Sequence, residues 1–211
     1  AYTVRDRESG EELVVDNKYI MSPKDLCTVD FLDRFLDAGV RVLKIEGRAR
    51  SADYVKRVVE CYDEALRAIE EGTYTPERAE QWKERLRTVF NRGFWGGYYM
   101  GARAGEWSRT YGSSATVRKV YVGKVTNYFA RIGVIELQVE AAPLSVGEPV
   151  FLTGETTGVV EFVVEEIRVA LKPVQEAPQG VLCSIKVPTL IRRGDKLFKT
   201  VPSDEKADRN R

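Results

Sequence analysis

Residues 38–48 read AGVRVLKIEGR, and this stretch decides the fold of the first half of the chain. Its glycine suits the end of a preceding helix, and the alternation after the glycine is typical of a β-strand. Because alternate side chains of a strand share a face, we expect Val42, Lys44 and Glu46 to line one side. That side changes from apolar to charged toward the end of the strand, where parallel α/β barrels place their sites.

Helical patterns flank this strand on both sides. The run SPKD at residues 22–25 predicts a helix start, with Cys27 in the first turns, where the helix dipole lowers a thiol pKa. Ser51 is the expected cap of a long second helix, and Thr75 followed by proline begins a third. The helix–strand–helix–helix order with short loops is typical of an α/β layer.

From residue 117 onward the pattern alternates with a period of two, which indicates strands. Glycine-containing turns are expected between these strands, with Gly123 as one of the turn residues. Short strands at this spacing predict a small antiparallel β-barrel or sandwich. The fold class is therefore α+β, with domains at residues 1–112 and 113–201 and a frayed tail at 202–211. The expected strands are 117–125, 132–139, 149–152, 159–167, 181–186 and 196–200.

Composition excludes several classes of protein. The chain has 211 residues, a net charge of +1, three cysteines and no histidine. Histidine-dependent triads and zinc sites are therefore excluded for this chain, as is a disulfide scaffold. No apolar run reaches the roughly 18 residues of a membrane-spanning helix, and no leader is visible, so we expect a cytoplasmic protein without membrane contact. Neither half has the broad basic excess of a nucleic-acid-binding surface, although a local patch remains open.

The charged end of the predicted strand is the first candidate site. Lys44 would orient an anionic substrate group, Glu46 would hold Lys44 and act as a base, and Arg48 would clamp a phosphate or carboxylate. The alternative is a structural Lys–Glu ion pair with a surface arginine. We therefore interpret these three residues as the candidate catalytic set.

The second candidate is the loop FNRGFWGGYY at residues 90–99. Asn91, Arg92 and Tyr98 are expected to shape a substrate-binding rim, with glycines allowing close backbone approach. The alternative is that the aromatic side chains fill the seam between the two domains, because such a loop exposes more apolar surface than is usual. For Cys27 the alternatives are a metal ligand and a small buried apolar residue.

Four ordered blocks carry a family resemblance: NKYIMSPKDLC at 17–27, residues 38–48, SADYV at 51–55 and FNRGF with GY at 90–98. Together they resemble the collagenase-like peptidases of family U32. The resemblance implies that this sequence holds the C-terminal remnant of a (βα)-barrel, whose upstream portion is its partner. It also implies a peptide or RNA substrate, and no peptidase activity for this stretch alone.

Some members of that family are similar to iron–sulfur proteins of RNA or ubiquinone hydroxylation. Cys27 matches the last of their four cluster cysteines, whereas the earlier three have no counterpart here. The resemblance thus implies no cofactor in this chain alone. Cys27 would bind a metal or iron–sulfur cluster only in the intact protein.

The second half has a further resemblance, carried by VGKV at 122–125, LSVGEPV at 144–150 and RRGDKL at 192–197. These runs resemble the second-domain barrels of translation factors. Three functions therefore stay open: a peptidase, an iron–sulfur-dependent hydroxylation protein of RNA or quinone, and a module that binds RNA or protein. The sequence does not predict the oligomeric state.

Overall fold

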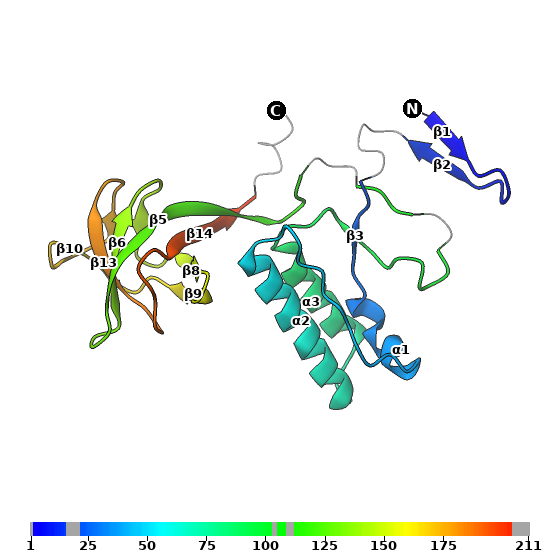
Figure 1. Cartoon of the computed structure of the whole chain (residues 1–211), viewed down its shortest axis with the longest axis horizontal. Coiled ribbons are helices and arrows are strands. Elements are labelled where there is room, and N and C mark those ends of the chain that lie inside the picture. The colour runs from blue at the N-terminus through cyan, green and yellow to red at the C-terminus, as the bar shows by residue number, and fades with distance from the viewer. Residues whose placement is uncertain (1, 16–21, 103–104, 109–111, 204–211) are drawn as a thin grey trace. The chain divides into compact units, whose positions relative to one another are not determined.

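The computed structural model describes residues 2–15, 22–102, 105–108 and 112–203. It divides into two compact units. The first comprises Ala1–Arg50 and Arg57–Thr116, and the second comprises Ser51–Lys56 and Val117–Arg211. Figure 1 shows the helices of the first unit and the large sheet of the second.

The first unit contains helices α1 (Leu32–Asp37) and α3 (Pro76–Arg87) and most of α2 (Ala52–Glu70), with a 3₁₀ turn at Val29–Phe31 before α1. The two longer helices begin where the sequence predicts. At the start of α3 the Thr75 hydroxyl accepts a hydrogen bond from the backbone N–H of Arg78 at 3.3 Å, so one free donor of the first turn is satisfied. The buried side chains of these two helices form the core between them: Val58, Cys61, Ala65 and Ala68 on α2, and Ala79, Trp82 and Leu86 on α3.

The helix expected from residue 22 is wrong in its first turns. Residues Asp25–Leu26 instead form strand β3, which pairs in parallel with β4 (Phe94–Trp95). The backbone N–H of Asp25 donates to the Gly93 carbonyl at 2.9 Å, and that of Cys27 donates to the Trp95 carbonyl at 3.0 Å. These long-range bonds satisfy backbone groups that a helix would otherwise pair locally.

Residues 40–47, where the sequence predicts a strand after Gly39, follow an extended course but do not pair with another described strand. Residues 40–47 have no strand partner in the described part of the chain, and Val42 is 85% exposed. Gly39 itself takes a positive φ of 88° and ends the preceding helix as predicted. Because a strand is stabilised by its neighbours, alternation alone does not produce one.

The second unit is built on an eight-stranded antiparallel sheet, ordered β11-β10-β13-β6-β5-β14-β8-β9. Its inward rows form one apolar core, with Ile135, Leu137 and Leu197 fully buried. The large antiparallel sheet is confirmed, whereas its closure into a barrel stays a prediction. The strands are β5 (Val117–Phe129), β6 (Val134–Val139), β8 (Pro149–Gly154), β9 (Gly158–Val163), β10 (Ile167–Val169), β11 (Lys172–Val174), β13 (Leu182–Lys186) and β14 (Lys196–Pro202).

Two small sheets complete the architecture. In the second unit β7 (Leu144–Ser145) pairs with β12 (Glu176–Ala177), and neither strand is predicted by the sequence. In the first unit β1 (Tyr2–Arg5) and β2 (Glu12–Val15) form an antiparallel hairpin. No helix in the described ranges is both long enough and apolar enough to cross a lipid bilayer.

Two details of the second unit correct the sequence reading. Gly123 lies inside β5 and not in a turn. A Cβ there would stand 2.0 Å from the carbonyl oxygen of Gln138, so the close approach of the neighbouring strand requires glycine. The single strand expected at 159–167 is two strands, β9 and β10. They separate at Val164, whose backbone N–H donates to the Glu148 carbonyl at 3.1 Å.

Candidate functional site

The candidate site is a cluster of one carboxylate and two guanidinium groups in the first unit. An oxygen of Asp25 accepts from Arg50 at 3.0 Å and from Arg92 at 3.3 Å. Its other oxygen accepts from the backbone N–H of Arg92 at 2.9 Å. The Asp25 and Arg50 side chains are 16% and 17% exposed, and that of Arg92 is 33% exposed. We call these three residues the Asp25 cluster.

The local folding explains why the three groups meet. Pairing of β3 with β4 brings Asp25 beside the loop that carries Arg92. A tight turn places Arg50, the third residue of the cluster, near Asp25, and in this turn the Arg50 backbone N–H donates to the Gly47 carbonyl at 3.0 Å. Ala49 within this turn has a φ of 59°, which is rare for a residue with a side chain.

Neighbouring side chains hold both arginines. The Arg50 guanidinium carbon lies 4.1 Å above the ring centroid of Phe90, a cation–π contact. Asn91 is buried at 3% exposure and orders the loop before Arg92. Its amide donates to the Val89 carbonyl at 2.9 Å, and its side-chain oxygen accepts from the Gly93 N–H at 3.1 Å. The loop therefore presents the arginine from a fixed backbone.

The chemistry of the guanidinium groups makes this cluster suited to an anion. Arginine suits bidentate binding of carboxylate or phosphate. In addition, Nε of Arg92 is buried and has no hydrogen-bond acceptor within the described residues. A buried donor without an acceptor is costly, so an anionic ligand that accepts this bond would be stabilised here.

The candidate catalytic residues lie apart from any ladder. Lys44, Glu46 and Arg48 are all exposed in the extended segment that ends at the cluster's turn. The Glu46 carboxylate accepts from the Arg48 backbone N–H at 2.8 Å, so these two residues are brought together. Figure 1 shows this segment running between α1 and α2.

Cys27 is buried and its environment differs from the one that the sequence predicts. It follows β3 and precedes the 3₁₀ turn, so no helix dipole acts on it as expected. Burial raises the pKa of the Cys27 thiol, which corrects the expectation of a lowered thiol pKa. Tyr62 lies beside it, and its hydroxyl accepts from the Thr28 backbone N–H at 2.9 Å. Among the described residues no three metal-ligating side chains gather at one point, so Cys27 alone does not form a metal site.

Tyr98 lies at the exposed end of the aromatic loop. It is 61% exposed, and its ring meets that of Trp95 edge to face at 5.2 Å between centroids. Gly97 allows the loop to approach β3, because a Cβ there would stand 2.8 Å from a methyl carbon of Leu26. The loop thus places Tyr98 beyond β4, four residues after the start of that strand.

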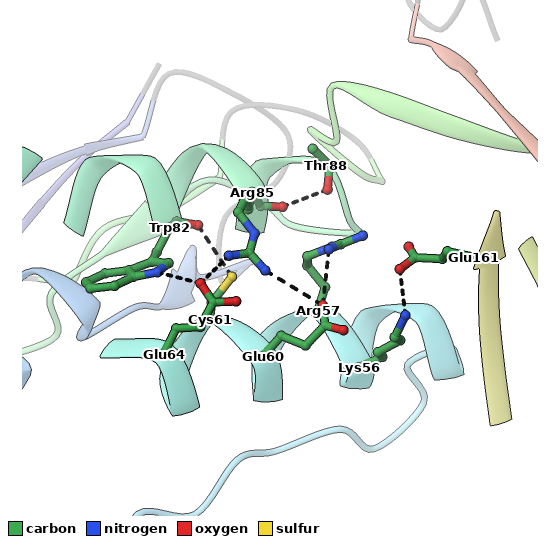
Figure 2. Close-up of polar contacts among 9 residues, drawn as sticks. All are labelled: Lys56, Arg57, Glu60, Cys61, Glu64, Trp82, Arg85, Thr88 and Glu161. Carbon is green, nitrogen blue, oxygen red and sulfur yellow. Dashed lines mark hydrogen bonds and ion pairs between the residues drawn. The ribbon is translucent and has the colours of Figure 1, made fainter. Parts of the chain in front are cut away.

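A second polar network joins α2 to α3 and serves as a scaffold. Glu64 accepts from the Trp82 indole N–H at 3.0 Å and from Arg85 at 2.5 Å (Figure 2). Arg85 also lies 3.8 Å from Glu60, which pairs with Arg57 at 3.1 Å. The hydrogen bond from Arg85 lowers the pKa of Glu64. Every charge here faces a partner, so the network fixes the two helices and leaves no free group for a ligand.

Comparison with known proteins identifies the family. The model of peptidase family U32 matches residues 1–109. The chain belongs to this family. It is 52% identical over 198 residues to a collagenase of Porphyromonas gingivalis, a match that covers 94% of this chain and 48% of that protein.

Other U32-related matches carry different names. An uncharacterized protease of Methanocaldococcus jannaschii is 33% identical over 190 residues, which is 89% of this chain and 46% of that protein. The tRNA hydroxylation protein P1 of Bacillus subtilis is 31% identical over 130 residues, 61% of this chain and 30% of that protein. The U32 chain therefore spans about half the length of the collagenase and protease relatives.

Solved structures resemble the U32 chain only in part. The C-terminal domain of a Geobacillus thermoleovorans U32 peptidase is 18% identical, with a TM-score of 0.36, covering 37% of this chain and 96% of that one. A bacterial selenocysteine-specific elongation factor gives 17% identity and a TM-score of 0.29, covering 38% of this chain and 14% of that one. These TM-scores are too low to assign a shared fold.

The sequence missed two of the three residues in the Asp25 cluster. Arg92 is expected at a substrate rim, whereas Asp25 and Arg50 carry no expected role. The sequence did contain a signal that could have marked them as candidate site residues, because both stand in or beside the blocks that resemble the family. What the blocks do not show is that a β3–β4 pairing brings them together.

Proposed function

We propose that this chain is part of a collagenase-like U32 peptidase, in which the Asp25 cluster binds a carboxylate group of a peptide substrate. The observation that carries the proposal is the buried Nε of Arg92, which lacks an acceptor among the described residues and belongs to a guanidinium group that shares the Asp25 carboxylate with Arg50. The 52% identity to a collagenase over 94% of the chain supports a peptide as the substrate.

The extended segment supplies the remaining proposed chemistry. Lys44, Glu46 and Arg48 stay the proposed catalytic set, and they end at the turn that positions Arg50. In the proposed intact protein, residues 40–47 pair with strands of an upstream (βα)-barrel portion, which is the partner of this stretch. Parallel barrels carry their sites at such strand ends. We therefore expect no peptidase activity from residues 1–211 alone.

The experiment compares the complete protein with this chain in gelatin zymography and in a soluble peptide assay. In the complete protein, Arg92→Ala is expected to raise KM about tenfold or more with a smaller change in kcat, because charged hydrogen bonds contribute about 1.5–3 kcal/mol. Arg67→Ala is the control, since Arg67 is 69% exposed and pairs only with Asp63 on its own helix among the described residues. An unchanged KM for Arg92→Ala contradicts the proposed carboxylate site, and a cleared gelatin band from this chain alone contradicts its inactivity.

A second candidate is an iron–sulfur-dependent hydroxylation protein that acts on RNA or on quinone. Its supporting observation is the 31% identity to a tRNA hydroxylation protein, and the Asp25 cluster would then hold a phosphate. Cys27 would bind a metal only in the intact protein, because the described residues supply no further ligands. Iron and sulfide analysis of the complete protein, prepared without oxygen, tests this candidate. Unchanged iron content in Cys27→Ser rejects Cys27 as a ligand.

A further inference from the structure

On the outward face of four adjacent strands in the second unit, one row of side chains places two lysines opposite each other. Lys196 of β14 lies directly opposite Lys124 of β5, and Lys124 lies opposite Gln138 of β6. Both lysines are exposed, and neither has an ion-pair partner among the described residues. Directly opposite side chains on one face stand about 4.5–5.5 Å apart at Cβ, and like charges in that position are destabilising.

The turn before β14 adds more positive charge at the same place. A Cβ on Gly194 would lie 3.8 Å from Cε of Lys124, so this lysine reaches the turn that carries Arg192 and Arg193. Both arginines are exposed. The acid of this turn, Asp195, is 6% exposed and accepts from the Thr157 hydroxyl and the Arg192 backbone N–H, and no ion pair joins it to either arginine side chain among the described residues. Uncompensated cations thus gather at one end of the sheet.

The other rows of this face carry an aromatic ring, one lysine, one glutamate and uncharged polar groups. Phe129 of β5 is 41% exposed and lies opposite Val134, whose other neighbour is Lys186 of β13. The row between contains Asn127, Glu136 and Ser184. The Glu136 carboxylate accepts from the Thr126 hydroxyl at 2.6 Å and is the one acid of these rows, so the lysines lie in the rows on either side of it. We call the outward rows of β14, β5, β6 and β13 the basic sheet face.

We propose that the basic sheet face binds a single-stranded nucleic acid. Lysines at its edge would neutralise backbone phosphates, and the exposed ring of Phe129 would stack on a base. An exposed ring beside amide and hydroxyl groups suits bases, whereas an acidic peptide requires only the cations. The near-neutral charge of the whole half does not indicate such a surface, because the cations are gathered locally. The inference rests on the second unit alone and is independent of the proposed peptidase site.

The experiment uses the full 211-residue chain and a fluorescein-labelled oligouridine RNA of about 20 nucleotides, longer than one small β-domain covers. Fluorescence anisotropy is recorded between about 50 and 200 mM KCl. Lys196→Glu is the decisive variant, since it places an opposite charge across from Lys124 and so keeps or raises stability. It is expected to weaken RNA binding about tenfold or more and to lower the salt slope by about 0.7 for each phosphate that is no longer neutralised.

Two further variants make the result specific. Lys172→Glu is the matched control, with the same charge change at an exposed site on β11, and it is expected to bind RNA like the parent chain. Phe129→Ala is expected to weaken binding about fivefold or more without changing the salt slope. Equal binding by Lys196→Glu and Lys172→Glu overturns the proposal. Equal affinity for polyglutamate and RNA, with no effect of Phe129→Ala, also overturns it and identifies an acidic protein as the partner.

Discussion

Removing the carboxylate of Asp25 is the sharpest test of the first unit. In Asp25→Ala, two guanidinium groups and one backbone N–H lose the oxygens that they contact at 2.9–3.3 Å. Breaking a buried pair costs about 3–5 kcal/mol, and a hydrogen bond to a charged group contributes about 1.5–3 kcal/mol. Because Arg92 is one-third exposed and can recover water, we expect a loss of about 2–4 kcal/mol in the free energy of unfolding.

Tryptophan fluorescence during urea unfolding reports this loss selectively. All three tryptophans, at positions 82, 95 and 107, belong to the first unit, so the signal follows that unit and not the large sheet. With a slope of about 1.5 kcal/mol per molar urea, the midpoint should fall by about 1.3–2.7 M. Asp37→Ala, an exposed aspartate on α1, is the control and should change stability by less than about 0.5 kcal/mol.

A double-mutant cycle separates the contact from general damage. Asp25→Ala, Arg50→Ala and the double variant should give an interaction energy of at least about 1 kcal/mol, since the two side chains touch at 3.0 Å. The reasoning is refuted if the interaction energy is near zero. It is refuted equally if Asp25→Ala unfolds at the same urea concentration as the Asp37→Ala control.

Three further predictions follow from burial, close approach and charge. Burial raises the pKa of Cys27, so its thiol should react slowly with a disulfide reagent at pH 8 and quickly in urea; fast reaction of the native chain would contradict this. Gly123→Ala should destabilise the second unit by about 3 kcal/mol in thermal melts followed by circular dichroism, because its Cβ would overlap a backbone oxygen, whereas Gly180→Ala meets no atom and should cost about 1 kcal/mol. The pKa of Glu64 is lowered by Arg85, so this carboxylate stabilises the fold above about pH 4.5 and the contribution is lost as pH falls. The stability difference between the parent chain and Glu64→Gln should stay under about 1 kcal/mol at pH 7, since the side chain is 44% exposed, and should shrink as the pH falls below about 4.5.

Local periodicity was sufficient for the elements that are stabilised locally. The helices α2 and α3 begin after Ser51 and at Thr75–Pro76 as predicted, because caps and a 3.6-residue stripe are visible in the sequence. Most strands of the large sheet overlap a predicted range for a similar reason, since one face is buried and alternation records it. Only β6 and β13 lie wholly inside such a range, and β11 is not predicted at all. Short strands such as β7 and β12 have only two residues each, too few for any alternation to be visible.

Contacts between distant residues could not be predicted in the same way. The run SPKD has the composition of a helix start, yet Asp25 pairs with a strand almost 70 residues later along the chain. Arg92 could be predicted as a binding residue because a glycine-rich aromatic loop marks a special backbone. Asp25 and Arg50 acquire their role only through that pairing, and the basic sheet face likewise exists only once β14 lies beside β5.

The extended segment at 40–47 unites these observations. It alternates like a strand, ends at a turn that positions Arg50, and leads into helix α2, yet Val42 is 85% exposed. Val59 on α2 is also 46% exposed. Burying one such valine fully would contribute about 1.5 kcal/mol or more. A neighbouring strand that pairs with residues 40–47 and covers Val42 would also fix Lys44 and Glu46 on one face. The same pairing would therefore stabilise the segment and order the proposed catalytic residues, which supports the proposal that activity requires an upstream barrel portion.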